Sequence, residues 1–455
     1  MTQISENYRP QALLETKTIL KLASPVIATQ LLQMATVVLD TLMAGRANAI
    51  ELSGVAVGSS LWVPLFLLLI GTLSALTPTI AQLAGSRRWS QMPFQVHQSL
   101  WKLLILLPFA WLTNFAVLPI FEFMNVNDDI TPVATGYISA MMWGLPALLA
   151  YTMLRYFSDG LGYTKPAMYA ALLGLVINAP LNYLFIFGEY GFPKLGGIGC
   201  GWASAISFWT MFIFMLAWVL LRKEYKHCRL FKRYYKPSAK HIFTLYKIGL
   251  PIGAAFMVES SVFSLIALFI SRFDATVVAA HQIALNVASL LFMVPLSIGL
   301  TLTIRIGQIV GSRQFHHARY VANLGIIMAL MYGFMTGILL WIFRLNIPEL
   351  YNSQIEVINL CSELLLFAAI FQIGDAAQVA IAGSLRGYKD TRVPMYLTIV
   401  AFWGIALPLG YSLGITGVTG EPLMAHGFWI GLIAGLTIVA ALLYVRLLRV
   451  SKKKH

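Results

Sequence analysis

The sequence predicts an all-α integral membrane protein with twelve transmembrane helices in two six-helix lobes related by internal duplication. Three observations predict this fold class: the scarcity of charge, the number of long apolar stretches, and the repetition of the first half of the chain in the second. Of the 455 residues, 58% are hydrophobic and only 11% are charged, whereas a soluble domain carries about 25% charged residues. The composition therefore excludes a soluble protein.

Twelve stretches of the chain are long and apolar enough to cross a bilayer. A crossing helix needs about 20 consecutive, mostly apolar residues. With breaks placed at charges, Gly and Pro, the predicted helices lie near residues 19–44, 52–83, 93–119, 132–157, 166–188, 197–221, 242–270, 276–310, 318–344, 357–384, 393–414 and 424–448.

Lys and Arg residues in the connections predict the orientation of the chain. They gather in alternate connections, most densely in RKEYKHCRLFKRYYKPSAK, residues 222–240. Because basic loops stay in the cytoplasm, both termini and this linker are predicted to be cytoplasmic. The basic run is interpreted as a topology anchor that touches anionic membrane lipid, and the alternative is a partner-binding site. The net charge of +14 is spread over short loops, which argues against a nucleic-acid partner.

The second half of the chain repeats the first at an offset of 226 residues. ILKLASPV, at 19–26, aligns with LYKIGLPI, at 245–252, and AQLAGSRR, at 81–88, aligns with GQIVGSRQ, at 307–314. Six helices in each copy give both copies the same orientation, so the repeats are parallel. Such a duplication is typical of a transporter in which one lobe rocks against the other, and the alternative is a duplicated scaffold.

The predicted organisation follows from the repeat and the linker. Its parts are a cytoplasmic N-terminal tail at 1–17, an N-lobe at 18–221, the basic cytoplasmic linker at 222–240, a C-lobe at 241–448 and a basic cytoplasmic tail at 449–455. The polar first seventeen residues lack the apolar core of a signal peptide. The three cysteines, Cys200, Cys228 and Cys361, show no metal-type spacing, and their odd number indicates no disulfide framework.

Three carboxylates lie inside the predicted helices: Asp40, Glu259 and Asp375. Such a charge costs about 2.5–3.5 kcal/mol at the centre of a membrane helix. Every Lys and Arg, including Lys102 and Arg305, is expected near a helix end, so none of the three acids has a fixed countercharge. Their expected partner is a mobile cation, a proton or a basic substrate. The alternative is a protonated acid that only forms hydrogen bonds.

Polar residues on two helices extend this pattern. Asn178 and Asn182 share one face of their helix, and Pro180 between them lacks an N–H, which frees a backbone carbonyl. They are predicted to form an oxygen-rich lining beside a carboxylate, and the alternative is that they join neighbouring helices. In the helix predicted at 357–384, Phe371, Asp375 and Gln378 form a stripe. Aromatic and Met side chains bind flat organic cations well, although most of them in a membrane protein face lipid or pack internally.

Five motifs resemble the multidrug and toxic compound extrusion (MATE) family, in its bacterial NorM subgroup. They are PVIATQLLQMATVVLDTLMAG, TKPAMYAALLGLVINAPLNYLFIFG, LGGIGCGWASA, AAHQIALN and GSLRGYKDT, and the resemblance runs from about residue 10 to residue 448. It implies twelve helices in two lobes in the bacterial inner membrane. It also implies efflux of cationic drugs and dyes, such as norfloxacin and ethidium, in exchange for Na⁺ or H⁺ and with no cofactor; we expect a monomer.

The resemblance also implies site residues. The cation site of the C-lobe, a transient Na⁺ site, falls on Glu259 and Asp375. The cation, proton or substrate site of the N-lobe falls on Asp40, Asn178, Asn182 and Ser204, which stands where relatives often have Thr. Phe371 replaces a Tyr that many NorM proteins carry four residues before the aspartate, so a hydroxyl that could bind Na⁺ is missing. Gln282 and Asn286 match a stretch that lines the C-lobe cavity.

Two other classes of protein compete with this interpretation. A lipid-linked oligosaccharide flippase of the same broad fold would be expected to carry cationic residues in its cavity, whereas the buried charges identified here are negative. A membrane-embedded enzyme would need a motif such as H-E-x-x-H or paired Asp-rich sequences, and the eight histidines are scattered. The phosphate-binding motif G-x-x-x-x-G-K-[ST] does not occur, so pumping must draw on an ion gradient.

Overall fold

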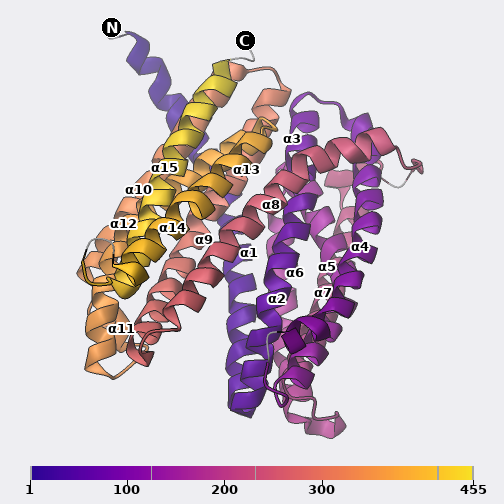
Figure 1. Cartoon of the computed structure of the whole chain (residues 1–455). Helices are drawn as coiled ribbons and strands as arrows, with labels where there is room; N and C mark the ends of the chain where they lie inside the picture. Colours follow the sequence, from indigo (N-terminus) through magenta and orange to yellow (C-terminus); the bar gives the residue numbers. More distant parts are fainter. Residues whose placement is uncertain (1–2, 124–125, 231, 418–419, 453–455) are drawn as a thin grey trace. The chain divides into compact units, whose positions relative to one another are not determined.

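The computed structural model describes residues 3–123, 126–230, 232–417 and 420–452, and every regular element in these ranges is a helix (Figure 1). The helices before the linker are α1 (Gln3–Ala47), α2 (Ala49–Leu73), α3 (Leu76–Gly85), η1 (Trp89–Gln91), α4 (Met92–Phe123), α5 (Thr131–Leu161), α6 (Lys165–Phe187), η2 (Glu189–Gly191) and α7 (Gly197–Leu221). Those from the linker onward are η3 (Lys223–Cys228), α8 (Ala239–Ile270), α9 (Ala275–Gly311), α10 (Phe315–Ile342), α11 (Asn346–Glu349), α12 (Ile355–Gly387), α13 (Arg392–Ile399), η4 (Val400–Ala406), α14 (Leu407–Tyr411), η5 (Ser412–Thr416) and α15 (Met424–Lys452).

Twelve spans of the described chain are long and apolar enough to cross a membrane, which confirms the predicted number. Two of them are composite: Ala49–Gly85 contains α2 and α3, and Arg392–Thr416 contains α13, η4, α14 and η5. In the latter, Pro408 cannot donate a backbone hydrogen bond, and π-helical turns flank it. Helix α1 begins at Gln3, within the predicted N-terminal tail, and it includes QALLETK at 11–17, which consists mainly of strong helix formers. Lys453 and Lys454 of the predicted C-terminal tail lie outside the described residues.

The chain forms two compact units. Unit 1 comprises the described residues of Met1–Ser24 and Ala254–His455, and unit 2 comprises Pro25–Gly253. The two units therefore divide inside α1 and inside α8. Each unit has its own apolar core; Trp62, Leu145 and Phe157 lie in the core of unit 2, and Leu302, Phe402 and Trp429 lie in that of unit 1.

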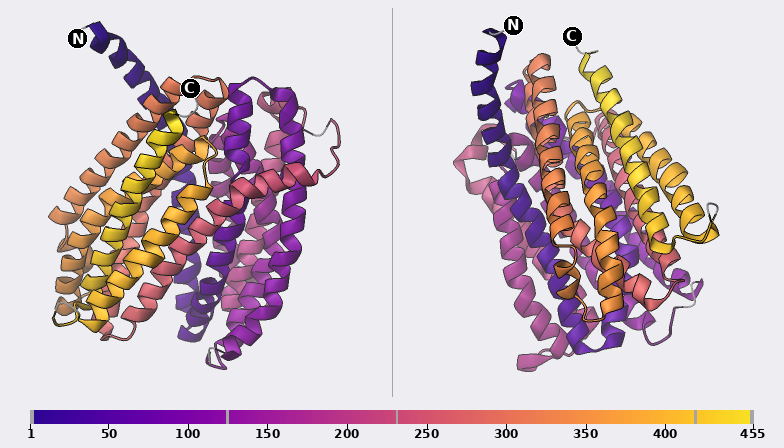
Figure 2. Two further views of the ribbon diagram at one scale, coloured as in Figure 1. Left: turned by 45° about the horizontal axis from the view of Figure 1, so that its top comes forward. Right: turned by 90° about the vertical axis from the view of Figure 1, so that its left-hand side faces the viewer.

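Within each unit, long helices pack side by side around the core. In unit 1, α12 packs against α9, α10 and α15, and the start of α1 and the end of α15 lie at the same end of this unit (Figures 1 and 2). In unit 2, α5 packs against α2 and α7, and α6 packs against α7. These contacts place α6 and α7, which carry the predicted polar residues of the first half, next to each other.

The internal duplication is visible in two threonines at equivalent positions, each of which donates a hydrogen bond to the backbone of the neighbouring helix. The Thr77 hydroxyl donates to the carbonyl oxygen of Tyr156 at 3.4 Å in unit 2. The Thr303 hydroxyl, 226 residues further along, donates to the carbonyl oxygen of Gly383 at 2.8 Å in unit 1. Gly383 permits this close approach, because a Cβ there would lie 2.1 Å from the carbonyl oxygen of Gly299. The repeat read from the sequence is therefore also a repeat of helix contacts.

The break between α2 and α3 accounts for a buried lysine that the sequence analysis misplaced. We expected Lys102 near a helix end, but it lies well inside α4 and is 0% exposed. Its Nζ donates to the backbone oxygen of Thr72 at 2.8 Å. Because α2 ends one residue later, its last carbonyls lack helical donors, and an ammonium group there supplies one.

The first turns of α1 are held in unit 1 by a buried ion pair. The Arg305 guanidinium donates two hydrogen bonds to the Glu15 carboxylate, at 2.9 and 2.5 Å. His317 contacts the same carboxylate through Nε2 at 2.9 Å, and Ile19 lies in the core of the unit. Arg305 lies six residues before the end of α9, near a helix end as expected, but it is paired with Glu15 across the unit. Correspondingly, the first turns of α8 belong to unit 2, where the Tyr246 hydroxyl donates to the backbone oxygen of Lys102 at 3.3 Å.

We predict that Arg305→Ala lowers the free energy of unfolding by about 3–5 kcal/mol, because it leaves the buried Glu15 carboxylate without its main partner. Glu15→Ala should cost less, since the Arg305 side chain is 25% exposed and can be hydrated. The double variant should lose less than the sum of the two. Unfolding of the purified protein in detergent measures all three, with Glu363→Ala as the control, whose carboxylate is 63% exposed. Additive losses would show that the pair contributes nothing.

Candidate functional site

Unit 2 contains a ring of four hydrogen-bonded polar side chains. Asn182 Nδ2 donates to Asp40 Oδ1 at 2.5 Å and to Asn178 Oδ1 at 2.8 Å. Asn178 Nδ2 donates to the Ser204 hydroxyl at 3.3 Å, and this hydroxyl donates to Asp40 Oδ2 at 3.0 Å, which closes the ring. The structure thus brings together all four residues that the sequence analysis assigned to the first half of the chain.

Three helices build this ring from simple local features. Asp40 comes from α1, the two asparagines lie one turn apart on α6 on either side of Pro180, and Ser204 comes from α7. All four side chains are buried. Cys200, one turn before Ser204 on α7, donates its thiol to the backbone oxygen of Asp40 at 3.7 Å. Sequence reasoning did not assign this role to Cys200, although its i, i+4 spacing to Ser204 indicates a shared face.

The ring surrounds Asp40 with dipoles and not with a countercharge. Within the part of the chain that the structure describes, no Lys or Arg forms an ion pair with Asp40, and Arg46 is exposed. Asn182 Oδ1 is buried and accepts no hydrogen bond from any described residue. A carboxylate beside an unused amide oxygen is a set of hard oxygen donors, which suits a proton or a hard cation.

The carboxylates of unit 1 have a different environment. Asp375, on α12, is 4% exposed, and Glu259, on α8, is half-buried. They are close enough for the charge of Glu259 to act on Asp375. No described residue forms a hydrogen bond or an ion pair with either carboxylate. Two acids that repel each other in a low-dielectric surrounding favour the uptake of a proton or a metal cation.

One cation acts on this pair from a distance, which corrects the expectation that no fixed charge is near. Arg386, in the last turn of α12, attracts Glu259 electrostatically, while its guanidinium stacks over the Phe256 ring at 4.7 Å from the centroid. The attraction of Arg386 lowers the cost of the Glu259 charge.

The four residues of unit 1 that the sequence analysis assigned to the substrate cavity differ in burial. Phe371 is buried and packs edge-on against Trp429 and Phe263, with ring centroids 5.6 and 6.2 Å apart. Gln378 is buried, and its Oε1 accepts no hydrogen bond from a described residue. Gln282 and Asn286 are exposed on α9. The described residues contain no cluster of three or more His, Cys, Asp or Glu side chains that could hold a metal ion.

Sequence reasoning missed two further buried acids. Asp159, near the end of α5, is 6% exposed and faces Arg155 at 3.5 Å, and Arg155 also donates to Gln30 at 3.1 Å. Glu15, in α1, is paired with Arg305 as described above. The i, i+4 spacing of Arg155 and Asp159 could have revealed the first pair, whereas the second joins residues 290 positions apart. Both acids have a fixed cationic partner, unlike Asp40 and Asp375.

The MatE family profile matches the chain twice, at residues 25–184 and 251–412. The chain belongs to the MatE family. It is 42% identical over 443 residues to the Multidrug resistance protein NorM of Photobacterium profundum, an alignment that covers 97% of this chain and 96% of the relative. It is also 42% identical over 444 residues to the Multidrug resistance protein PmpM of Pseudomonas aeruginosa, with 96% and 92% covered.

The fold agrees with this family. The crystal structure of the eukaryotic MATE transporter AtDTX14 superposes with a TM-score of 0.86 at 18% identity, covering 97% of this chain and 98% of that one. The two family matches begin 226 residues apart, the offset of the internal repeat. The resemblance to the MATE family and its NorM subgroup is thereby confirmed, and the chain is a multi-pass membrane transporter, not an enzyme.

We predict that Ser204→Ala opens the ring around Asp40. It removes a donor to a buried carboxylate and an acceptor for Asn178, so the free energy of unfolding should fall by about 1.5–3 kcal/mol. Ser204→Thr should retain most of this stability, because it keeps the hydroxyl. Ser207→Ala is the matched control: it lies one turn away on α7, is buried, and donates only to the Ala203 carbonyl of its own helix at 2.8 Å. Equal losses at 204 and 207 would contradict the ring.

Proposed function

We propose that this protein exports cationic organic compounds, such as norfloxacin and ethidium, across the bacterial inner membrane in exchange for Na⁺. The single observation that carries the proposal is the pair Glu259 and Asp375, two carboxylates in membrane-spanning helices with no contacting cation among the described residues. The names of the relatives, multidrug resistance proteins at 42% identity over nearly the full length, support the substrate class.

The carboxylate pair couples the two fluxes by competition. When the pair is empty, two negative charges repel each other in a medium that also disfavours each one. A coupling ion relieves this cost, and so does a cationic drug. Because one site then serves both cations, binding of one favours release of the other. Each time the site changes from opening on one side of the membrane to opening on the other, it would carry either an ion inward or a drug outward.

Charge balance limits the energy that such an exchange can use. Moving one charge through 100 mV is worth about 2.3 kcal/mol. One Na⁺ entering for one monovalent drug leaving cancels this contribution, and only the concentration gradient of the ion remains. The membrane potential contributes only if more positive charge enters than leaves.

We propose Na⁺ over H⁺ as the coupling ion from the NorM relationship. Phe371 is the feature that separates this chain from many of those relatives, because it offers no hydroxyl one turn before Asp375. Its ring packs against Trp429. Phe371 therefore provides the aromatic packing that a Tyr would provide, but it lacks the hydroxyl oxygen that could bind Na⁺. A Na⁺ site here would draw its oxygens from Glu259, Asp375 and neighbouring groups such as the unused Oε1 of Gln378.

The ring around Asp40 is proposed as the second cation, proton or substrate site. It differs from the pair in unit 1 because its carboxylate already accepts two hydrogen bonds. The unused Asn182 Oδ1 supports a cation or proton there. Gln282 and Asn286, which are exposed on α9, remain proposed lining residues of the substrate path.

The proposed setting follows from the distribution of charge. Both termini and the linker at 222–240 are placed in the cytoplasm by the positive-inside rule, and the transporter is proposed to work as a monomer whose lobes are residues 18–221 and 241–448. The flippase alternative gains no support from Lys102, because its ammonium group serves the carbonyl at the end of α2.

Transport in proteoliposomes with Na⁺ and pH gradients imposed separately tests the proposal. The purified protein should expel ethidium when Na⁺ is more concentrated on the side that receives the dye. Glu259→Gln and Asp375→Asn should each reduce this rate at least about tenfold, because an amide cannot bind the cation by charge. Glu363→Gln is the control: it removes one carboxylate from the same helix as Asp375, but an exposed one.

Three results would count against parts of the proposal. If a pH gradient without Na⁺ drives ethidium transport as fast as a Na⁺ gradient does, the coupling ion is H⁺. Normal transport by both carboxylate variants would exclude the competition mechanism. No movement of ethidium or norfloxacin by the folded wild-type protein would exclude cationic drugs as its substrates.

A further inference from the structure

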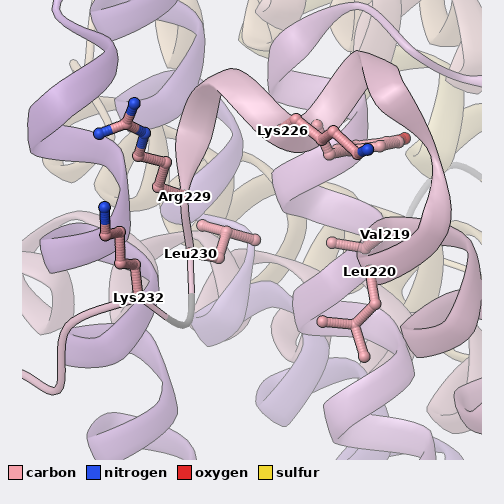
Figure 3. A pocket seen from close by; sticks show the side chains of 7 residues that line it. Val219, Leu220, Lys226, Arg229, Leu230 and Lys232 are labelled. Carbon is pink, nitrogen blue, oxygen red and sulfur yellow. The ribbon is translucent and has the colours of Figure 1, made fainter.

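The linker after α7 contains a small cavity that is separate from the carboxylate sites. Its volume is about 230 Å³, less than the about 300–1,000 Å³ of pockets that hold drug-sized ligands. The apolar part of its wall comes from Val219, Leu220 and Leu230. The cationic part comes from Lys226, Arg229 and Lys232 (Figure 3). The size and the mixed wall fit a small anionic group attached to an apolar body.

The wall of this cavity is held in place by burial of the linker. Tyr225, Cys228 and Leu230 are buried in the core of unit 2. The Tyr225 hydroxyl lies 2.6 Å from the Ser158 hydroxyl of α5. The Tyr225 phenol is neutral at neutral pH and does not repel an anion. Three residues beside or within the cavity wall are thereby anchored in the core of unit 2.

The cavity carries an excess of positive charge. The linker, residues 222–240, has eight Lys and Arg residues and a single acid, Glu224. The head groups of Arg229 and Lys232 point to the same side of the cavity (Figure 3), and neither forms an ion pair with any described acid. Arg229 also has a left-handed φ of 46°, a conformation that disfavours a residue with a side chain. Two neighbouring cations without an acid between them favour a bound anion.

The cavity lies at the boundary of the membrane. The membrane span of α7 ends at Leu221, and Val219 and Leu220 of its last turn line the cavity. Leu220 and Leu221 are exposed, as expected for side chains that contact acyl chains. Arg222 stacks over Trp218 at 4.2 Å, an arrangement typical of residues at the lipid head-group level.

We propose that this cavity binds one anionic phospholipid, with the phosphate held between Arg229 and Lys232 and the acyl chains lying along Leu220 and Leu221. The general lipid contact expected of a basic loop thus becomes a discrete site with named residues. The proposal does not depend on the transported substrate or on the coupling ion. Phosphate is also available from solution, so the experiment must separate a lipid from a free anion.

Native mass spectrometry of the full-length protein, released from detergent, measures whether the protein retains a bound lipid and so tests the proposed site. Titration with phosphatidylglycerol should give a species that retains one lipid at low lipid concentration, whereas phosphatidylcholine should not. Arg229→Gln with Lys232→Gln should weaken retention by about tenfold or more. The control is Lys223→Gln with Lys240→Gln, which removes the same charge from the linker region at two exposed residues outside the cavity. It should bind phosphatidylglycerol like the wild type.

Two outcomes would overturn the proposal. If both double variants lose retention equally, the linker attracts lipid by its total charge and the cavity is not a site. If inorganic phosphate at millimolar concentration displaces the lipid and is itself retained by the wild type, the cavity binds a soluble anion. Folding of each variant is checked by its unfolding temperature in phosphatidylcholine, so a loss of retention in a folded protein reports on the cavity.

Discussion

The cost of a carboxylate inside an apolar membrane protein is the constraint on which the rest of this structure depends. Each buried acid shows how that cost is met. Glu15 has Arg305, and Asp159 has Arg155, so both are neutralised by a fixed partner. Asp40 has two hydrogen-bond donors but no cation, and Asp375 has neither among the described residues. The compensation decreases along this series, and the need for a mobile partner increases with it. The acids with a fixed cationic partner and the acids proposed to bind a mobile cation therefore differ in their partners and not in their depth.

The two units of the duplicated architecture surround their buried carboxylates differently. Thr77 joins α3 to α5 and Thr303 joins α9 to α12, so the two units share this pairing of helices. On this framework, unit 2 surrounds one carboxylate with amides and a hydroxyl, whereas unit 1 has a pair of carboxylates and packed aromatic rings. The division of the chain inside α1 and α8 means that each of these helices takes part in both units. Asp40 lies on α1 and Glu259 lies on α8, so both carboxylates lie on helices that cross the division of the chain.

Much of this could be predicted from the sequence, and the successes have a common cause. Long apolar stretches report helix number directly, because a bilayer sets their length. The i, i+4 spacing of Asn178 and Asn182 placed both amides on one face, and motif resemblance added Asp40 and Ser204. The failures also share a cause. The pairing of Glu15 with Arg305 joins residues 290 positions apart. The contact of Lys102 with the Thr72 carbonyl joins residues 30 positions apart. Long-range packing of this kind leaves no local pattern.

The central claim is that a coupling ion and a cationic drug compete for the carboxylates Glu259 and Asp375. Equilibrium dialysis of ethidium against the purified protein at fixed pH, over a series of Na⁺ concentrations, measures this competition without any transport step. The account predicts that the apparent dissociation constant of ethidium rises in proportion to Na⁺ above a threshold, and that K⁺ at equal ionic strength has a much smaller effect. It further predicts that Glu259→Gln with Asp375→Asn weakens ethidium binding and makes the binding that remains independent of Na⁺. Ethidium binding that does not respond to Na⁺ or to pH in the wild-type protein would contradict the account.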